Sequence, residues 1–113
     1  MRDERKLPEA ATQFEILLES HPEVAEPWSE LANVRMVMQQ YSGALDALDH
    51  VRALRAEKAG DVFYRALAFD HLNKRPEALE SYHRFLEMSQ GKLPTQEFQA
   101  RQRARILEVE LRR

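Results

Sequence analysis

Apolar residues recur every three or four positions along most of the chain, which is the spacing that places them on one face of an α-helix. The first such stretch spans residues 7–21. Its apolar face is formed by Ala10, Phe14, Leu17 and Leu18. Pro8 suits a first helical turn, because its missing N–H would have no partner there. Pro22 ends the helix, since it drives the preceding residue out of helical backbone angles.

The next apolar stretches predict a helical hairpin over residues 24–56. Its two helices are expected over 24–39 and 43–55, with a short polar turn between them. Ser42 is the expected N-cap of the second helix, because its hydroxyl can accept a hydrogen bond from an N–H group of the first turn.

A second hairpin of the same layout is predicted over residues 59–88. Its helices are expected over 61–72 and 76–88, with Asp61 as the N-cap of the first. A last helix is expected over 95–112, capped by Thr95 in the same way.

Residues of matching size recur at an interval of thirty-four positions, and the comparison needs no gap. The matched sets are Ala10, Ala44 and Ala78; Phe14, Leu48 and Tyr82; Leu17, Val51 and Phe85; and Ala32 with Ala66. Small residues let two helices approach closely, and large residues fill the space between successive hairpins. We therefore predict an all-α fold in one domain: an α-α superhelix, or solenoid, of about two and a half hairpins plus a C-terminal helix.

These positions resemble the tetratricopeptide repeat, whose pattern places Trp, Leu, a small residue and an aromatic on a first helix and Ala and a large residue on a second. The residues that fit are Trp28, Leu31, Ala32, Ala44 and Leu48 in one repeat, and Val62, Ala66, Phe69, Ala78 and Tyr82 in the next. Pro22 fits the proline that closes a repeat, so residues 7–21 read as the second helix of a partial repeat. The resemblance covers residues 7–88.

Four positions depart from the family pattern. Arg35 stands where an aromatic residue is usual, and Arg65 stands where Leu is usual. Ala56 and Gln90 occupy positions at which proline is common. The alanines expected at the helix contacts are all present, so the departures leave the predicted fold intact.

Composition indicates a folded chain: 43% of the 113 residues are hydrophobic and 32% are charged. Cysteine is absent, which excludes disulfides and thiol catalysis and suits a reducing, cytoplasmic location, although a periplasmic or secreted parent protein stays open. Residues 1–6 form a charged lead-in with no apolar stretch behind it, so no signal peptide is visible. No apolar run is long enough to span a membrane.

Charge is distributed unevenly, although the net charge is only -2. Between residues 9 and 49 eight acidic side chains stand against one basic side chain, Arg35. Between residues 101 and 113 five arginines stand against two glutamates. A nucleic-acid-binding chain usually carries a stronger basic field with aromatic residues interleaved. We therefore expect no nucleic-acid partner.

Side chains suited to catalysis or metal binding are scattered along the chain. The four histidines are His21, His50, His71 and His83, and their spacing is not that of metal ligands. Asp70 and His71 are helical neighbours that point about 100° apart, so they form no catalytic dyad. Glycine-rich phosphate loops and nucleophile elbows are absent. We expect no enzyme activity, no metal site and no cofactor.

The resemblance implies partner binding, because the first helices of the hairpins in this family line a concave groove. The matching outward positions are Glu26, Glu30, Asn33, Met36, Phe63, Tyr64, Leu67, Asp70 and His71. The acidic residues would select basic partners, and the aromatic residues would anchor a peptide. The alternative is that Phe63, Leu67 and Val37 are core between helices. A grip on a C-terminal carboxylate is not supported, because Ser29, Phe63 and Leu67 stand where basic or amide groups are needed.

The predicted function is a protein-protein interaction module or scaffold that binds a peptide or protein. One alternative is a structural segment of a larger multidomain protein, and we expect a fragment of a longer array because the first repeat lacks its leading helix. Another is self-association through the ends, which carry opposite charges and favour a head-to-tail contact. The last helix has a second apolar stripe, Phe98, Ile106 and Val109, unless Phe98 tucks under the loop at Lys92.

Overall fold

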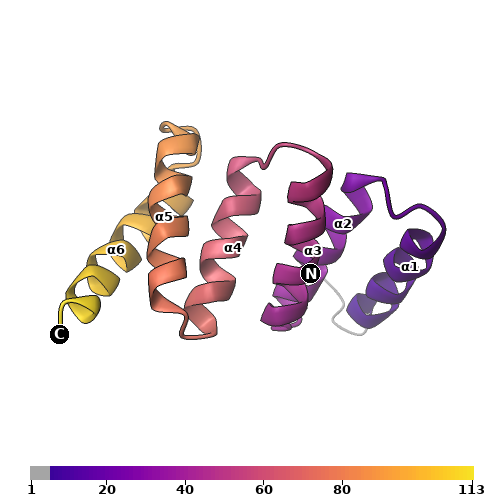
Figure 1. Cartoon of the computed structure of the whole chain (residues 1–113), viewed down its shortest axis with the longest axis horizontal. Coiled ribbons are helices and arrows are strands. Elements are labelled where there is room, and N and C mark those ends of the chain that lie inside the picture. Colours follow the sequence, from indigo (N-terminus) through magenta and orange to yellow (C-terminus); the bar gives the residue numbers. More distant parts are fainter. Residues whose placement is uncertain (1–5) are drawn as a thin grey trace. The chain divides into compact units, whose positions relative to one another are not determined.

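A computed structural model describes residues 6–113, and within that range the chain contains six helices and no strand. The helices are α1 (Lys6–Ser20), α2 (Ala25–Val37), α3 (Tyr41–Leu54), α4 (Ala59–His71), α5 (Arg75–Ser89) and α6 (Pro94–Leu111) (Figure 1). The predicted all-α fold is confirmed, and the packing of the hairpins is consistent with an α-α superhelix. The lead-in predicted over residues 1–6 lies, except for Lys6, outside the described residues.

The described helices group into two compact units, with the boundary between Ala56 and Glu57. The first unit contains α1, α2 and α3. Helices α2 and α3 form its hairpin, and α1 packs on α2. The fully buried apolar residues of the hairpin are Leu31, Ala32, Ala44, Ala47 and Val51.

The buried face of helix α1 only partly matches the predicted one, since Leu18 is buried and Ala10 and Phe14 are half-buried. Leu7, Ala11 and Leu18 are buried, whereas Leu17 is 44% exposed. The spacing of four and seven residues places the three buried side chains on one side of the helix, and Leu17 points about 100° away from its neighbour Leu18. The prediction of Leu17 as core is therefore wrong.

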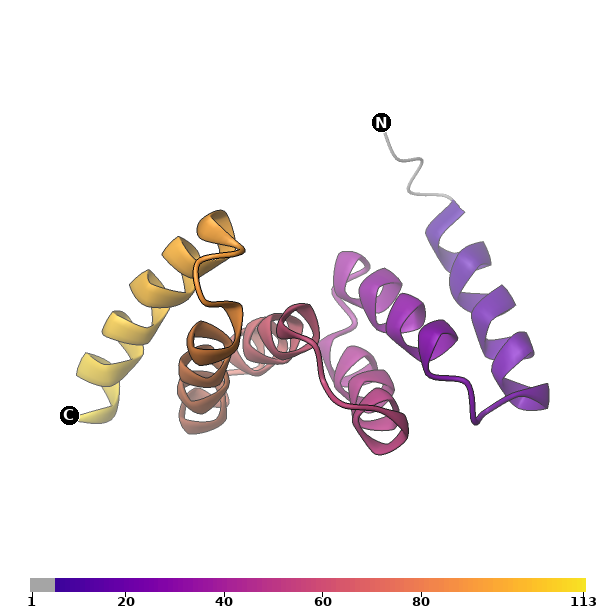
Figure 2. The same ribbon diagram turned by 90° about the horizontal axis from the view of Figure 1, so that it is seen from above.

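The second unit contains α4, α5 and α6. Helices α4 and α5 form its hairpin, and α6 runs beside α5 (Figures 1 and 2). Its core joins all three helices: Val62, Phe63, Ala66, Ala78, Tyr82, Phe85, Ala100, Ala104 and Leu107. The rings of Phe63 and Phe85 lie 4.9 Å apart at 46°, a tilted arrangement that aromatic pairs favour.

The two hairpins share one turn geometry, thirty-four residues apart. In the first, the Gln39 N–H donates to the Met36 carbonyl at 3.0 Å, and the Gln40 N–H donates to the Arg35 carbonyl at 2.8 Å. This pair of bonds is a Schellman motif, which requires a left-handed residue after the helix. Gln39 has φ of 61°, and Asn73 has φ of 60° at the same place in the second hairpin. The repeat predicted from the sequence is therefore present in the backbone.

Replacing Gln39 by glycine should stabilise the chain by about 1 kcal/mol, because a positive φ strains a residue that has a Cβ atom. Asn73→Gly should give a smaller gain, since asparagine tolerates this conformation better. Urea unfolding is the measurement, and Gln39→Ala is the control because it keeps the Cβ. A loss of stability in Gln39→Gly would contradict the assigned turn.

The predicted N-caps are wrong, because each of them lies inside the first turn of its helix. They were Ser42, Asp61 and Thr95, and the residues at the N-cap positions are Gln40, Lys58 and Leu93. The Asp61 carboxylate accepts a hydrogen bond from the Lys58 N–H at 2.9 Å, and the Glu97 carboxylate accepts one from the Leu93 N–H at 3.1 Å. The bond from Leu93 lowers the pKa of the Glu97 carboxyl. Acidic side chains thus reach back to the N-cap from inside the helix.

Candidate partner-binding site

Six of the nine predicted site residues lie on one side of a hairpin's first helix, three in each unit. We use the term first-helix face for both sets, each within its own unit: Glu26, Glu30 and Asn33 on α2, and Tyr64, Leu67 and His71 on α4. Their spacing of three and four residues places each set on one side of its helix. Glu26, Glu30 and His71 are exposed, and Asn33, Tyr64 and Leu67 are half-buried. Each unit therefore presents part of the predicted surface to solvent.

The other three predicted residues are buried or half-buried. Phe63 is 7% exposed and lies in the core of the second unit against Phe85, so the alternative that it is core is confirmed. Met36 is half-buried. Val37, which the same alternative placed in the core, is instead 47% exposed. Asp70 is held by neighbouring side chains.

The Asp70 carboxylate ties three helices together. From α6, Arg103 donates to it through Nε at 2.7 Å and Nη2 at 2.8 Å. From α5, the Tyr82 hydroxyl donates to it at 2.8 Å. A two-bond guanidinium–carboxylate pair is among the stronger polar contacts in proteins. Asp70 is thus primarily a structural residue of the second unit.

Protonation of this cluster follows from its surroundings. Burial alone would raise the pKa of the Asp70 carboxyl, but the hydrogen bonds from Arg103 and Tyr82 and the charge of Arg103 outweigh burial and hold that pKa below its usual range. Burial, together with the bond to Asp70, raises the pKa of the Tyr82 hydroxyl. At neutral pH Asp70 is therefore an ionised acceptor, and Tyr82 is a neutral donor.

A surface depression of about 320 Å³ lies beside this cluster. It is lined by Leu67, Asp70, His71, Tyr82 and Arg103. The two bonds to Asp70 fix the orientation of the Arg103 guanidinium, whose side chain is 39% exposed. A guanidinium held in one orientation can receive a carbonyl or carboxylate of a bound chain with less loss of side-chain entropy.

The sequence prediction missed Arg103 and the role of the Tyr82 hydroxyl. Asp70 and Arg103 are thirty-three positions apart, close to the repeat interval, so they stand at nearly the same level of α4 and α6, which α5 separates in the chain. Extending the repeat into α6 would have suggested the pair. Ala100, thirty-four positions after Ala66 and likewise fully buried, is the signal that was available.

Two of the four departures from the tetratricopeptide pattern, Arg35 and Arg65, make polar contacts. In the first unit, Arg35 donates through Nη1 to the Gly43 carbonyl at 2.9 Å, so it joins α2 to α3. A Cβ atom at Gly43 would lie 3.2 Å from the Arg35 Cδ, which explains the glycine. In the second unit, the Arg65 Nε lies 3.2 Å from the Glu57 Oε2.

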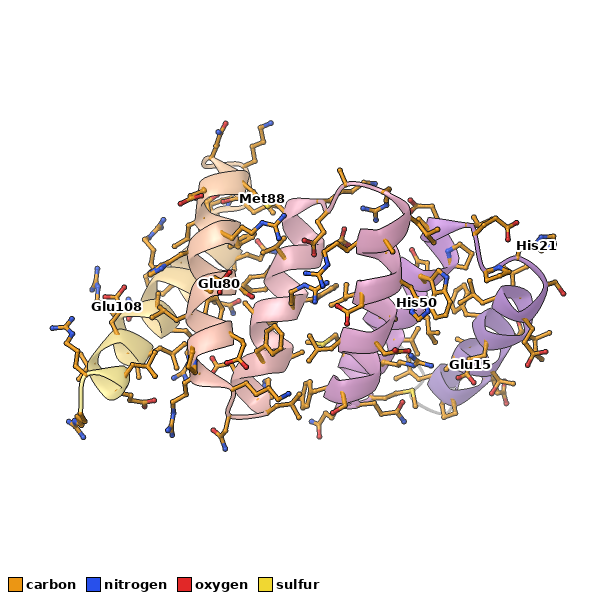
Figure 3. The ribbon with its side chains drawn as sticks, viewed as in Figure 1. Glu15, His21, His50, Glu80, Met88 and Glu108 are labelled. Carbon is orange, nitrogen blue, oxygen red and sulfur yellow. The ribbon has the colours of Figure 1, made fainter. Side chains whose placement is uncertain are left out.

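Trp28, the most prominent residue of the family pattern, has a structural role. Its ring stacks on His50, labelled in Figure 3, with centroids 3.8 Å apart and planes at 9°. Its Nε1–H donates to the Pro22 carbonyl at 2.9 Å. These contacts fix the approach of α2 to α3 and the chain that enters α2. Both the ring and the N–H group of Trp28 therefore make contacts within the first unit.

Two kinds of feature, a cluster of potential metal ligands and a membrane-spanning helix, are both absent from residues 6–113. Within that range there is no group of three or more His, Asp or Glu side chains placed to hold a metal ion. None of the helices in the same range combines the length and the apolar character needed to cross a bilayer.

Among models of known protein families none matches the chain, and no curated protein has a similar sequence.

Proposed function

We propose that the chain is a tetratricopeptide-like interaction module that binds a protein or peptide through the first-helix face. The observation that carries the proposal is that both units expose side chains of this face, Glu26 and Glu30 in the first unit and His71 in the second. On α2 the face is acidic, with Glu26 and Glu30. On α4 it presents Tyr64, Leu67 and His71 beside the depression at Arg103.

The two parts of this face favour different chemistry. Glu26 also accepts a hydrogen bond from Arg55 at 3.3 Å, but its side chain stays 66% exposed, so a basic partner can still reach it. The apolar and aromatic side chains on α4 suit a peptide anchor, and an Arg103 fixed by Asp70 suits an acceptor on the peptide backbone. Basic residues of a partner therefore suit the part on α2, and apolar residues suit the part on α4.

Glu30→Ala and His71→Ala should each weaken binding to a captured partner by about tenfold or more, the range seen when an interface residue matters. Both side chains are exposed, so the fold should be unaffected. Tyr64 is less suitable, because it packs against the core. The measurement is affinity capture by the immobilised chain, then titration of the captured protein.

Glu80→Ala is the matched control for Glu30→Ala. Glu80 is exposed on α5, outside the first-helix face, and is labelled in Figure 3. It should bind the partner as the unmodified chain does. Equal affinity in Glu30→Ala, His71→Ala and Glu80→Ala would exclude the first-helix face as the binding surface.

A further inference from the structure

The side of α6 that faces away from α5 carries an exposed apolar stripe. Phe98 is 59% exposed, Ile106 44% and Val109 50%. Phe98 therefore does not tuck under the loop at Lys92. Ile106 and Val109 also line a shallow hollow of about 420 Å³, together with Gln102, Arg105, Glu110 and Arg113. Single exposed apolar residues are ordinary, but three on one side of one helix form a patch of the kind that marks an interaction.

The repeat register indicates what type of helix this stripe would accept. Ala32, Ala66 and Ala100 are all fully buried and stand thirty-four positions apart, so α6 has the register of a first helix. In each hairpin a first helix packs against a second helix, α2 against α3 and α4 against α5. Helix α1 has the register of a second helix, since it ends at Ser20, thirty-four positions before the end of α3.

Charge and apolar exposure on α1 complement those on α6. Helix α1 exposes Ile16 at 59% and Leu17 at 44%. Its exposed charged residues are three glutamates, Glu9, Glu15 and Glu19, and one lysine, Lys6. The stripe on α6 is flanked by exposed arginines, Arg105 and Arg112. Opposite charges around two apolar patches favour and orient their association.

We propose that the outward stripe of α6 binds α1 of a second copy of this chain, head to tail. In this contact α6 would act as the first helix of a hairpin, and α1 of the other copy would act as its second helix. The pairing would then match those of α2 with α3 and α4 with α5. Such a contact joins two different surfaces, so a dimer still offers one α1 and one α6 to further copies. This surface is separate from the first-helix face.

The first test is sedimentation at concentrations up to roughly 100 μM, where even a complex with micromolar Kd is populated. At low salt the average mass should rise with concentration beyond that of one chain. At about 1 M salt the association should weaken several-fold, because the screening length falls to about 3 Å. A single monomeric species at every concentration and both salts would overturn the proposal and leave the stripe to another partner.

The second test separates a head-to-tail contact from a symmetric one. Val109→Arg blocks the α6 surface, and Leu17→Arg blocks the α1 surface, so each variant alone should be monomeric. Mixed together they should form a one-to-one dimer and nothing larger, because each retains the surface that the other has lost. If the mixture stays monomeric, the contact is not head to tail.

Val37→Arg is the matched control for Val109→Arg. Val37 is 47% exposed on α2, against 50% for Val109, and lies neither on the α6 stripe nor on α1. It should associate as the unmodified chain does. Circular dichroism of all three variants should show unchanged helix content, which separates loss of association from loss of fold.

Discussion

Replacing Glu57 by alanine should destabilise the second unit by about 3 kcal/mol, because it leaves a buried positive charge without its carboxylate. The Glu57 side chain is only 1% exposed and the Arg65 side chain 7%. The Arg65 Nε lies 3.2 Å from the Glu57 Oε2, and the Arg84 Nη1 lies 2.6 Å from the Glu57 Oε1. Desolvation of one ion of such a pair is offset only while its partner is present.

Urea unfolding measures this loss of stability. Two further variants test whether the loss comes from the buried pair of Glu57 and Arg65. Arg84→Ala should cost less than about 1 kcal/mol, because the Arg84 side chain is 49% exposed and its charge is screened by water. The double variant Glu57→Met/Arg65→Leu should recover much of the loss, since apolar residues often replace a buried ion pair without penalty. A Glu57→Ala chain as stable as the unmodified one would show that the pair is not buried in solution.

Ala44→Leu and Ala78→Leu should each destabilise the chain by about 1–3 kcal/mol, because added methyl and methylene groups overpack a tight contact. Both alanines are fully buried, and they stand at equivalent places in the two hairpins. Ala53→Leu is the matched control, since Ala53 is an exposed residue of the same helix as Ala44. Thermal melts should leave Ala53→Leu nearly unchanged, and unchanged melting in all three would contradict the thirty-four-residue register.

The thirty-four-residue repeat could be predicted because it depends on side-chain size, which the sequence gives directly at each position. The buried alanines at Ala32, Ala44, Ala66 and Ala78 follow from their spacing alone. The N-caps could not be fixed in this way. Asp61 at the third helical position and an aspartate at the N-cap give the same sequence signal, because both satisfy N–H groups at the helix start.

The surface was harder to predict than the core. Helical spacing correctly predicted that Glu30 and His71 are exposed. It could not show that the Asp70 carboxylate accepts hydrogen bonds from Tyr82 and Arg103. Which of the many arginines pairs with Asp70 depends on how α6 packs on α5, and that packing is set by contacts distant in sequence. Phe63 was misassigned for a related reason, since an aromatic residue fits a groove and a core equally well.

The contacts of the Asp70 carboxylate also affect how the second unit unfolds. If α6 left α5, Asp70 would lose both hydrogen bonds from Arg103, and the core residues that α6 covers would become exposed. If α5 left, the Tyr82 hydroxyl and the core around it would be exposed together. Detaching any one of the three helices would expose apolar residues of the core that all three share, which makes intermediate states costly. We therefore expect the three helices to unfold in one cooperative step.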